Sequence, residues 1–116
     1  MPVSLVVDDS PAIRGYVRSI LQLEDFRTLE AEDGVQALQI MQELDGDVDL
    51  LVSDIQMPNG DGLSLANAVQ KAFPAVPVIL ISGQLKPDAN FEFLKKPFLP
   101  DALVKAVRKL FAHRKR

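Results

Sequence analysis

The chain has 116 residues, of which 47% are hydrophobic and 25% charged, and its formal net charge is −3. These values predict a single globular domain over residues 1–116 and give no reason to expect direct binding to nucleic acid. Because the sequence has no cysteine, disulfides and Cys-ligated metal sites are excluded, and its single histidine argues against a His-based metal site or a Ser–His nucleophile pair. No apolar run approaches the roughly 20 residues of a membrane span, and the first residues lack a basic signal-peptide region, so the expected location is cytoplasmic.

The first part of the chain predicts two strand–helix pairs. Residues 3–7 form a short run, mostly valine and leucine, that ends at Asp8 and Asp9, which indicates a buried strand. Ser10 and Pro11 then suit the N-cap and the first position of a helix. That helix is expected to reach residue 23, followed by a weaker edge strand over 26–31 and a second helix over 35–44.

The stretch 48–62, VDLLVSDIQMPNGDG, predicts the central strand of the sheet and a functional loop. Its apolar run at 50–52 is too short for a helix and is bounded by turn residues, which indicates a strand buried on both faces. Asp54 stands at the carboxyl end of this strand, and that edge is where open α/β sheets bind their ligands. A carboxylate there is partly desolvated, so it needs a partner or it costs stability.

The second half continues the pattern. We expect a helix over 63–73, a strand over 78–81 that ends at Ser82, a short strand over 91–94, and a last helix over 100–113. We also predict a cis peptide bond between Lys96 and Pro97, because the turn must aim Lys96 back at the strand ends while Pro97 leads away to the last helix. An X–Pro bond adopts the cis form at a cost of only about 0.5–1 kcal/mol.

The connection 83–92 has only ten residues between Ser82 and Phe93. Two parallel strands require the chain to return along the sheet, which is about 17 Å for a strand of five residues. Ten helical residues would span about 15 Å and leave none for the two turns. We therefore expect an irregular crossover with at most one helical turn, beginning at Pro87, with Phe91 or Phe93 covering part of the sheet.

Strands that alternate with helices indicate βαβ units, a parallel sheet and right-handed crossovers. We predict an α/β fold with a flavodoxin-like, doubly wound sheet of five parallel strands in the order 2-1-3-4-5. In this order the carboxyl ends of the strands meet at one edge. That edge collects the side chains of Asp8, Asp9, Asp54, Ser82 and Lys96.

The three carboxylates at this edge repel one another strongly. They coexist as anions only beside a cation, or else one of them takes a proton. Oxygen ligands without cysteine or histidine favour a hard ion, Mg²⁺ or Mn²⁺, and leave Lys96 and the Ser82 hydroxyl to hold an anion. A metal, a lysine, a hydroxyl and loop amides around one carboxylate predict a phosphoryl-transfer site in which Asp54 is the nucleophile and forms an aspartyl phosphate.

Each of these residues has a plainer interpretation when it is taken alone. Asp8 and Asp9 could end a strand in solvent, and Ser82 could be a turn or cap residue. Lys96 could be a solvated surface charge, and Phe93 is most simply a core residue. The occurrence of the whole set at one sheet edge favours the functional interpretation.

Five motifs follow one another along the chain: VVDDSP at 6–11, EAEDGVQAL at 30–38, SDIQMPNGDG at 53–62, VILISG at 78–83 and FLKKPF at 93–98. Through them the sequence resembles, over essentially its whole length, the response-regulator receiver domains, which are the phosphoacceptor modules of two-component signalling. Each motif alone is weak, whereas five in order at compatible spacing are specific. The resemblance implies a signalling domain that catalyses only its own phosphorylation and dephosphorylation, and not an enzyme that turns over a substrate.

The resemblance also implies roles for the residues at the sheet edge. Asp54 takes a phosphoryl group from a histidine kinase or a histidine phosphotransfer protein in a Mg²⁺-dependent reaction. Asp9 ligates the metal directly, Asp8 assists through water, and the backbone carbonyl of Gln56 completes the protein ligands. Lys96 pairs with the phosphate, and an output domain can follow in a longer chain.

Ser82 and Phe93 correspond, by the same resemblance, to the switch hydroxyl and the switch aromatic. Two features depart from the family pattern. Phenylalanine lacks the hydroxyl that a tyrosine would offer for a hydrogen bond. The connection 83–92 is about two helical turns shorter than usual, so the family's fourth helix is expected to be reduced or absent, and the usual dimer through that face is not expected.

Two other functions stay open. A pseudo-receiver would keep the fold as a protein-interaction module without phosphorylation, although such domains generally lack one of the residues that this chain retains. A phosphatase of the haloacid-dehalogenase type also uses an aspartate nucleophile at a strand end, but it carries a second aspartate two residues later, where this chain has Gln56. The basic tail 113–116 fits a solvated helix end that complements the helix dipole, or the stub of a linker.

Overall fold

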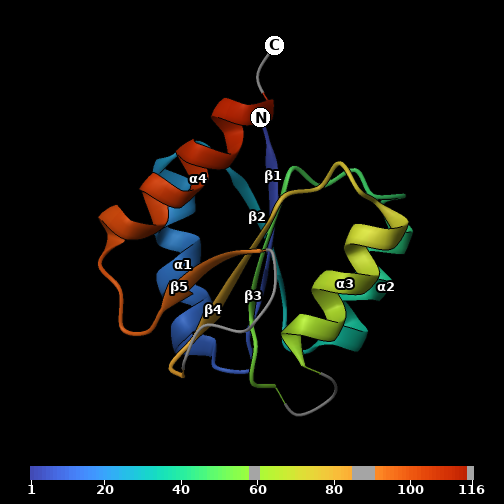
Figure 1. The fold of residues 1–116 in the computed structure, drawn as a ribbon, viewed down its shortest axis with the longest axis horizontal. Coiled ribbons are helices and arrows are strands. Elements are labelled where there is room, and N and C mark those ends of the chain that lie inside the picture. Colours follow the sequence, from blue (N-terminus) through green and yellow to red (C-terminus); the bar gives the residue numbers. More distant parts are fainter. Residues whose placement is uncertain (58–60, 85–90, 115–116) are drawn as a thin grey trace.

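The computed structural model describes residues 1–57, 61–84 and 91–114. In this part of the chain there are five strands and four helices (Figure 1). The strands are β1 (Val3–Val7), β2 (Arg27–Ala31), β3 (Leu50–Asp54), β4 (Val78–Ser82) and β5 (Glu92–Lys95). The helices are α1 (Pro11–Leu23), α2 (Gly34–Glu43), α3 (Gly62–Ala72) and α4 (Pro100–Arg114).

The five strands form one sheet with the order β2-β1-β3-β4-β5, and every neighbouring pair is parallel. The predicted flavodoxin-like order 2-1-3-4-5 is therefore confirmed. β1 and β3 are neighbours, in register from Ser4 opposite Leu50 to Val7 opposite Ser53. β2 lies on one side of β1, and β3, β4 and β5 follow on its other side. The order of the strands therefore reverses between β1 and β3, and sheets of this kind bind ligands at the carboxyl ends of the two strands that flank such a point.

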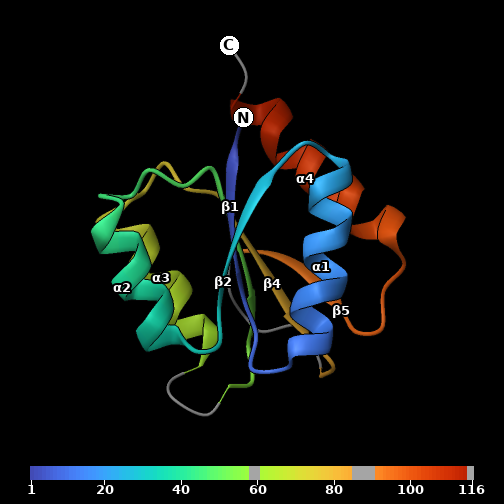
Figure 2. The same cartoon turned by 180° about the vertical axis from the view of Figure 1, so that it is seen from behind.

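Two helices cover each face of the sheet, as Figures 1 and 2 show. Alternate residues of the inner strands feed two cores: Leu50 and Ile79 belong to the cluster with α1 and α4, and Leu51 and Leu80 to the cluster with α2 and α3. All residues of β3 and β4 are buried. This confirms the prediction that the run 50–52 lies in a strand covered on both faces.

Three helices begin at the carboxyl edge of the sheet with a side-chain cap. Ser10 Oγ accepts a hydrogen bond from the Ile13 amide at 3.3 Å, which confirms the predicted N-cap of α1. Asp33 caps α2 and Asp61 caps α3 in the same way. A cap of this kind stabilises a helix by about 1 kcal/mol, so these residues fix where the connections end and the helices start.

The predicted elements agree with the observed ones to within one or two residues, and the Lys96–Pro97 peptide bond is cis, as predicted. Most of the connection 83–92 falls in the gap 85–90, so the prediction of an irregular crossover there lies outside the described residues. Gly83, Gln84 and Phe91, which flank the gap, belong to neither a helix nor a strand. The helix labelled α4 is the predicted C-terminal helix. No helix in the described ranges is both long and apolar enough to cross a membrane.

Candidate functional site

The carboxyl ends of β1 and β3 bring three carboxylates together. Asp8 and Asp9 follow β1, and Asp54 is the last residue of β3. One oxygen from each of the three side chains lies within 4.8 Å of the others, which is close enough to hold a metal ion. Asp8 and Asp54 are buried, with 2% and 5% of their surface exposed, whereas Asp9 is exposed. Two of the three carboxylates are therefore buried, and the third opens the cluster to solvent.

Lys96, directly after β5, points its ammonium group into this cluster. Its Nζ lies 3.3 Å from Asp8 Oδ2 and 3.4 Å from Asp54 Oδ1. A single cation thus faces two buried carboxylates. Asp54 Oδ1 is buried and accepts no hydrogen bond from any described residue. Since buried polar atoms are nearly always hydrogen-bonded, this oxygen has an open position for another ligand.

The pKa of Asp54 is raised above its usual value. Burial is the main cause, and the negative charge of Asp8 adds to it. The charge of Lys96 and a hydrogen bond from the Gln56 backbone oppose the shift without cancelling it. The contacts of Lys96 and Gln56 therefore do not fully offset the cost of burying the Asp54 anion beside Asp8, and a further cation at this edge would stabilise that anion.

A second set of residues holds the connection after β1 in place. The Ser10 amide donates to Asp8 Oδ1 at 2.9 Å, and Arg14 Nη1 donates to the Asp8 carbonyl oxygen at 2.7 Å. Arg14 Nε also pairs with Glu30 Oε1 at 3.0 Å, and Arg18 pairs with the other oxygen of Glu30. Burial on its own would raise the pKa of Glu30, but the two arginines outweigh it and lower that pKa. These contacts were missed from the sequence, although two arginines four residues apart on one helix face were a visible signal.

Ser82, the last residue of β4, is fully buried. Its hydroxyl donates to Gln56 Oε1 at 2.7 Å and accepts from the Gln84 amide at 3.0 Å. The sequence pointed to the backbone carbonyl of Gln56 as a metal ligand and gave its side chain no role. Phe93 is partly buried and packs against the core on the side of α2 and α3. Its role as a switch aromatic stays a prediction.

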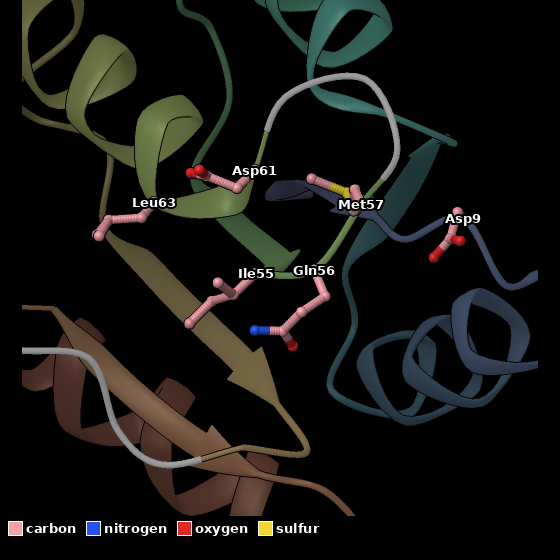
Figure 3. Close-up of a pocket in the computed structure, with 6 residues that line it drawn as sticks. All are labelled: Asp9, Ile55, Gln56, Met57, Asp61 and Leu63. Carbon is pink, nitrogen blue, oxygen red and sulfur yellow. The ribbon is translucent and has the colours of Figure 1, made fainter.

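An open pocket lies beside the carboxylates, over the connection between β3 and α3 (Figure 3). Of the predicted site residues, Asp9 and Gln56 line it. Figure 3 shows the Gln56 carboxamide pointing away from Asp9 and toward the end of β4. The pocket is lined by Asp9, Ile55, Gln56, Met57, Asp61 and Leu63.

Gly62 allows the start of α3 to lie directly against the end of β3. A Cβ atom at this position would stand 1.9 Å from the Asp54 carbonyl oxygen, much closer than any real contact. The Gly62 amide donates to the Ile55 carbonyl at 2.8 Å and closes the connection. Glycine is therefore required here to set the backbone that carries Asp54.

The sequence and the fold were compared with those of known proteins. The family model of the response regulator receiver domain matches residues 4–108. Among curated proteins, the sensor kinase CckA of Brucella abortus (strain 2308) is 41% identical in an alignment of 115 positions that covers 91% of this chain and 12% of that kinase. The chain spans half or less of the length of the curated relatives that head the comparison.

Two solved structures have the same fold, and each match covers nearly all of both chains. The receiver domain of the hybrid histidine kinase CckA is 34% identical, with a TM-score of 0.82, and the match covers 93% of this chain and 97% of that one. The response regulator protein TrrA of Thermotoga maritima, solved in complex with Mg²⁺-BeF, is 34% identical, with a TM-score of 0.85 and coverage of 95% and 99%.

Proposed function

Because the chain belongs to the response regulator receiver domain family, we propose that it accepts a phosphoryl group on Asp54 from a histidine kinase or a histidine phosphotransfer protein and changes conformation in response. The observation that carries this proposal is the buried Asp54 oxygen without a hydrogen-bond partner, 3.4 Å from the Lys96 ammonium. A nucleophile needs a lone pair that no hydrogen bond occupies and a nearby group that neutralises the charge of the incoming phosphate. Asp54 Oδ1 has the first, and Lys96 supplies the second.

The donor set fits a hard divalent cation, Mg²⁺ or Mn²⁺. Its protein ligands would be Asp9, Asp54 and the Gln56 backbone carbonyl, with Asp8 assisting through water. The fit rests on three carboxylates with oxygens within 4.8 Å of one another and on the raised pKa of Asp54. When bound, such an ion supplies positive charge against both the carboxylates and the phosphoryl oxygens.

In the proposed reaction an Asp54 oxygen attacks the phosphorus of the donor. A new O–P bond forms, the P–N bond to the donor imidazole breaks, and its electron pair stays on the imidazole nitrogen. Lys96, 3.4 Å from Asp54 Oδ1, would pair with a phosphoryl oxygen, and the Ser82 hydroxyl at the end of β4 is a candidate second donor. In dephosphorylation, water attacks the phosphorus and the O–P bond to Asp54 breaks, which gives inorganic phosphate and returns the Asp54 carboxylate. No other substrate is consumed, so the domain acts as a switch.

We further propose that residues 1–116 act as a single receiver domain, in the cytoplasm and without direct contact to nucleic acid. Support for a kinase partner or an attached output domain comes from the relatives, which include a sensor kinase and transcriptional regulatory proteins much longer than this chain. The complete set of site residues argues against a pseudo-receiver. A haloacid-dehalogenase-type phosphatase is disfavoured because the position of its general acid is Gln56, whose side chain is bonded to Ser82.

The test is phosphorylation by acetyl phosphate and Mg²⁺, followed by intact-mass measurement at neutral pH. We expect one added phosphoryl group, which does not appear when EDTA is present from the start of the reaction and is absent from Asp54→Asn. The matched control is Asp47→Asn, the same change at an exposed position before β3, at the opposite end of that strand. Equal labelling of Asp54→Asn, or labelling that EDTA does not affect, would refute the proposal.

A further inference from the structure

The Ser82 hydroxyl is fully committed in this structure. A serine hydroxyl has one proton to donate, and here that proton goes to Gln56 Oε1 at 2.7 Å. Its oxygen accepts from the Gln84 amide at 3.0 Å. Since Ser82 has 0% of its surface exposed, water does not reach the hydroxyl itself. The hydroxyl cannot donate to a second acceptor while the bond to Gln56 is intact.

Gln56 is well placed to act as a restraint on Ser82. β3 and β4 pair up to Asp54 opposite Ile81, and one more backbone bond follows, from the Ile55 amide to the Ile81 carbonyl. The bond from Gln56 to Ser82 extends this pairing by one step through side chains. In Figure 3 the carboxamide reaches from the loop toward the end of β4, although the residue itself is exposed. The bond thus joins the loop beyond Asp54 to the strand end that carries Ser82.

We propose that the Gln56 carboxamide is a positioning group that holds the Ser82 hydroxyl away from Asp54 until a phosphoryl group arrives. This inference rests on the proposed function, because a phosphoryl oxygen on Asp54 has no proton to give and needs donors. Ser82 must then exchange its bond to a neutral amide for a bond to an anion, which is the stronger of the two. The bond to Gln56 therefore opposes switching, and the phosphate overcomes it.

The consequence is a shift in a two-state equilibrium. Any interaction present only in the unphosphorylated arrangement lowers the apparent affinity for a ligand that needs the other arrangement. Loss of one hydrogen bond of ordinary strength corresponds to a change of about two- to tenfold in that affinity. The Gln56→Met variant keeps the length of the side chain and removes the acceptor, so it should favour the phosphorylated arrangement.

The experiment measures binding of beryllofluoride, a phosphoryl mimic, to the full chain by calorimetry at saturating Mg²⁺, with the Mg²⁺ affinity of each variant measured first. We expect Gln56→Met to bind the mimic about two- to tenfold more tightly than the wild type. In a Ser82→Ala background the same substitution should have no effect, because the bond is already absent. Gln70→Met, the same change at an exposed position on α3, is the control and should match the wild type.

A second readout reports on the bond directly in the unphosphorylated protein. The Gln84 amide, which donates to Ser82 Oγ, should change its NMR shift in Gln56→Met and not in Gln70→Met. The inference is overturned if Gln56→Met binds beryllofluoride no more tightly than the wild type. It is also overturned if Gln56→Met changes this affinity equally in the wild-type and Ser82→Ala backgrounds. Either result leaves the proposed function intact. If the wild type neither binds beryllofluoride nor takes a phosphoryl group with Mg²⁺, the proposed function itself fails.

Discussion

Gly62 offers a sharp test of how the backbone at the end of β3 supports the site. In Gly62→Ala the new Cβ would lie 1.9 Å from the Asp54 carbonyl oxygen and 2.8 Å from its carbonyl carbon. Contacts between Cβ and backbone atoms are not found below 3.0 Å, so α3 and the end of β3 must move apart by about 1 Å. The atoms in the way are backbone atoms, which cannot turn aside as a side chain would.

Two effects should follow from this displacement. Forcing an extra methyl group into a closely packed site costs typically about 1–3 kcal/mol, and we expect the free energy of unfolding of Gly62→Ala to fall by about 2 kcal/mol. A misplacement of about 1 Å at a reacting group also costs as much as 100-fold in rate. We therefore expect phosphorylation by acetyl phosphate to slow at least tenfold in protein that is still folded.

The measurements are urea denaturation and the rate of phosphoryl addition by intact mass, both compared with Gly15→Ala. Gly15 lies inside α1, and a Cβ there would meet nothing within 4 Å. Replacing glycine by alanine in a helix stabilises it by about 0.5–1 kcal/mol, so the control should be more stable than the wild type and should be phosphorylated normally. If Gly62→Ala behaved like Gly15→Ala in both assays, the argument from close approach would be wrong.

Two further predictions concern charges around the site. Because the folded state raises the pKa of Asp54, it binds more protons than the unfolded chain between the two pKa values, and stability falls as the pH rises through the folded pKa. In EDTA, Asp54→Asn should therefore be more stable than the wild type at pH 7, and this gain in the free energy of unfolding should disappear below about pH 4. Urea titrations at several pH values measure the gain, and an equal gain at all of them would contradict the prediction. Arg14→Met should lower the free energy of unfolding by about 1–3 kcal/mol because the Asp8 carbonyl loses its donor, whereas Arg18→Met, which removes a more exposed partner of Glu30, should cost less than about 1 kcal/mol. Equal losses in the two arginine variants would show that the bond to Asp8 adds nothing.

The strand ends were predictable from the sequence because parallel sheets impose a simple rule on them. Short apolar runs located the strands, and the residue after each run had to lie at the carboxyl edge. Asp8, Asp54 and Lys96 meet there as expected, with Lys96 within 3.4 Å of both carboxylates. Backbone topology brings these three residues to one edge, and the conformation of the Lys96 side chain then sets the distances to the carboxylates.

The contacts that surround these residues depend on side-chain conformation and were not predicted. Gln56 and Ser82 are separated by 26 residues, and their bond exists because the carboxamide turns toward β4 and away from Asp9. The pairing of Arg14 with Glu30 could have been predicted from the sequence if the pairing of β1 with β2 had been worked out. Glu30 lies opposite Val6 in the register of β1 and β2, and Val6 belongs to the core beneath α1, so Glu30 faces the helix that carries Arg14. A register for the edge strand would have revealed this contact.

The connections at this edge link the proposed phosphoryl site to β5 through the backbone as well as through charge. The Lys96 amide donates to the Ser82 carbonyl at 2.8 Å, while the Lys96 ammonium faces Asp54. Movement of Ser82 toward a phosphoryl group would therefore pull on the residue whose side chain pairs with the same group. β5 packs against α4, and the Phe98 carbonyl between them accepts a hydrogen bond from the Tyr16 hydroxyl on α1 at 2.8 Å. A change at Ser82 thus has a continuous path of bonded groups to the face formed by α1 and α4, while the restraint at Gln56 acts on its first step.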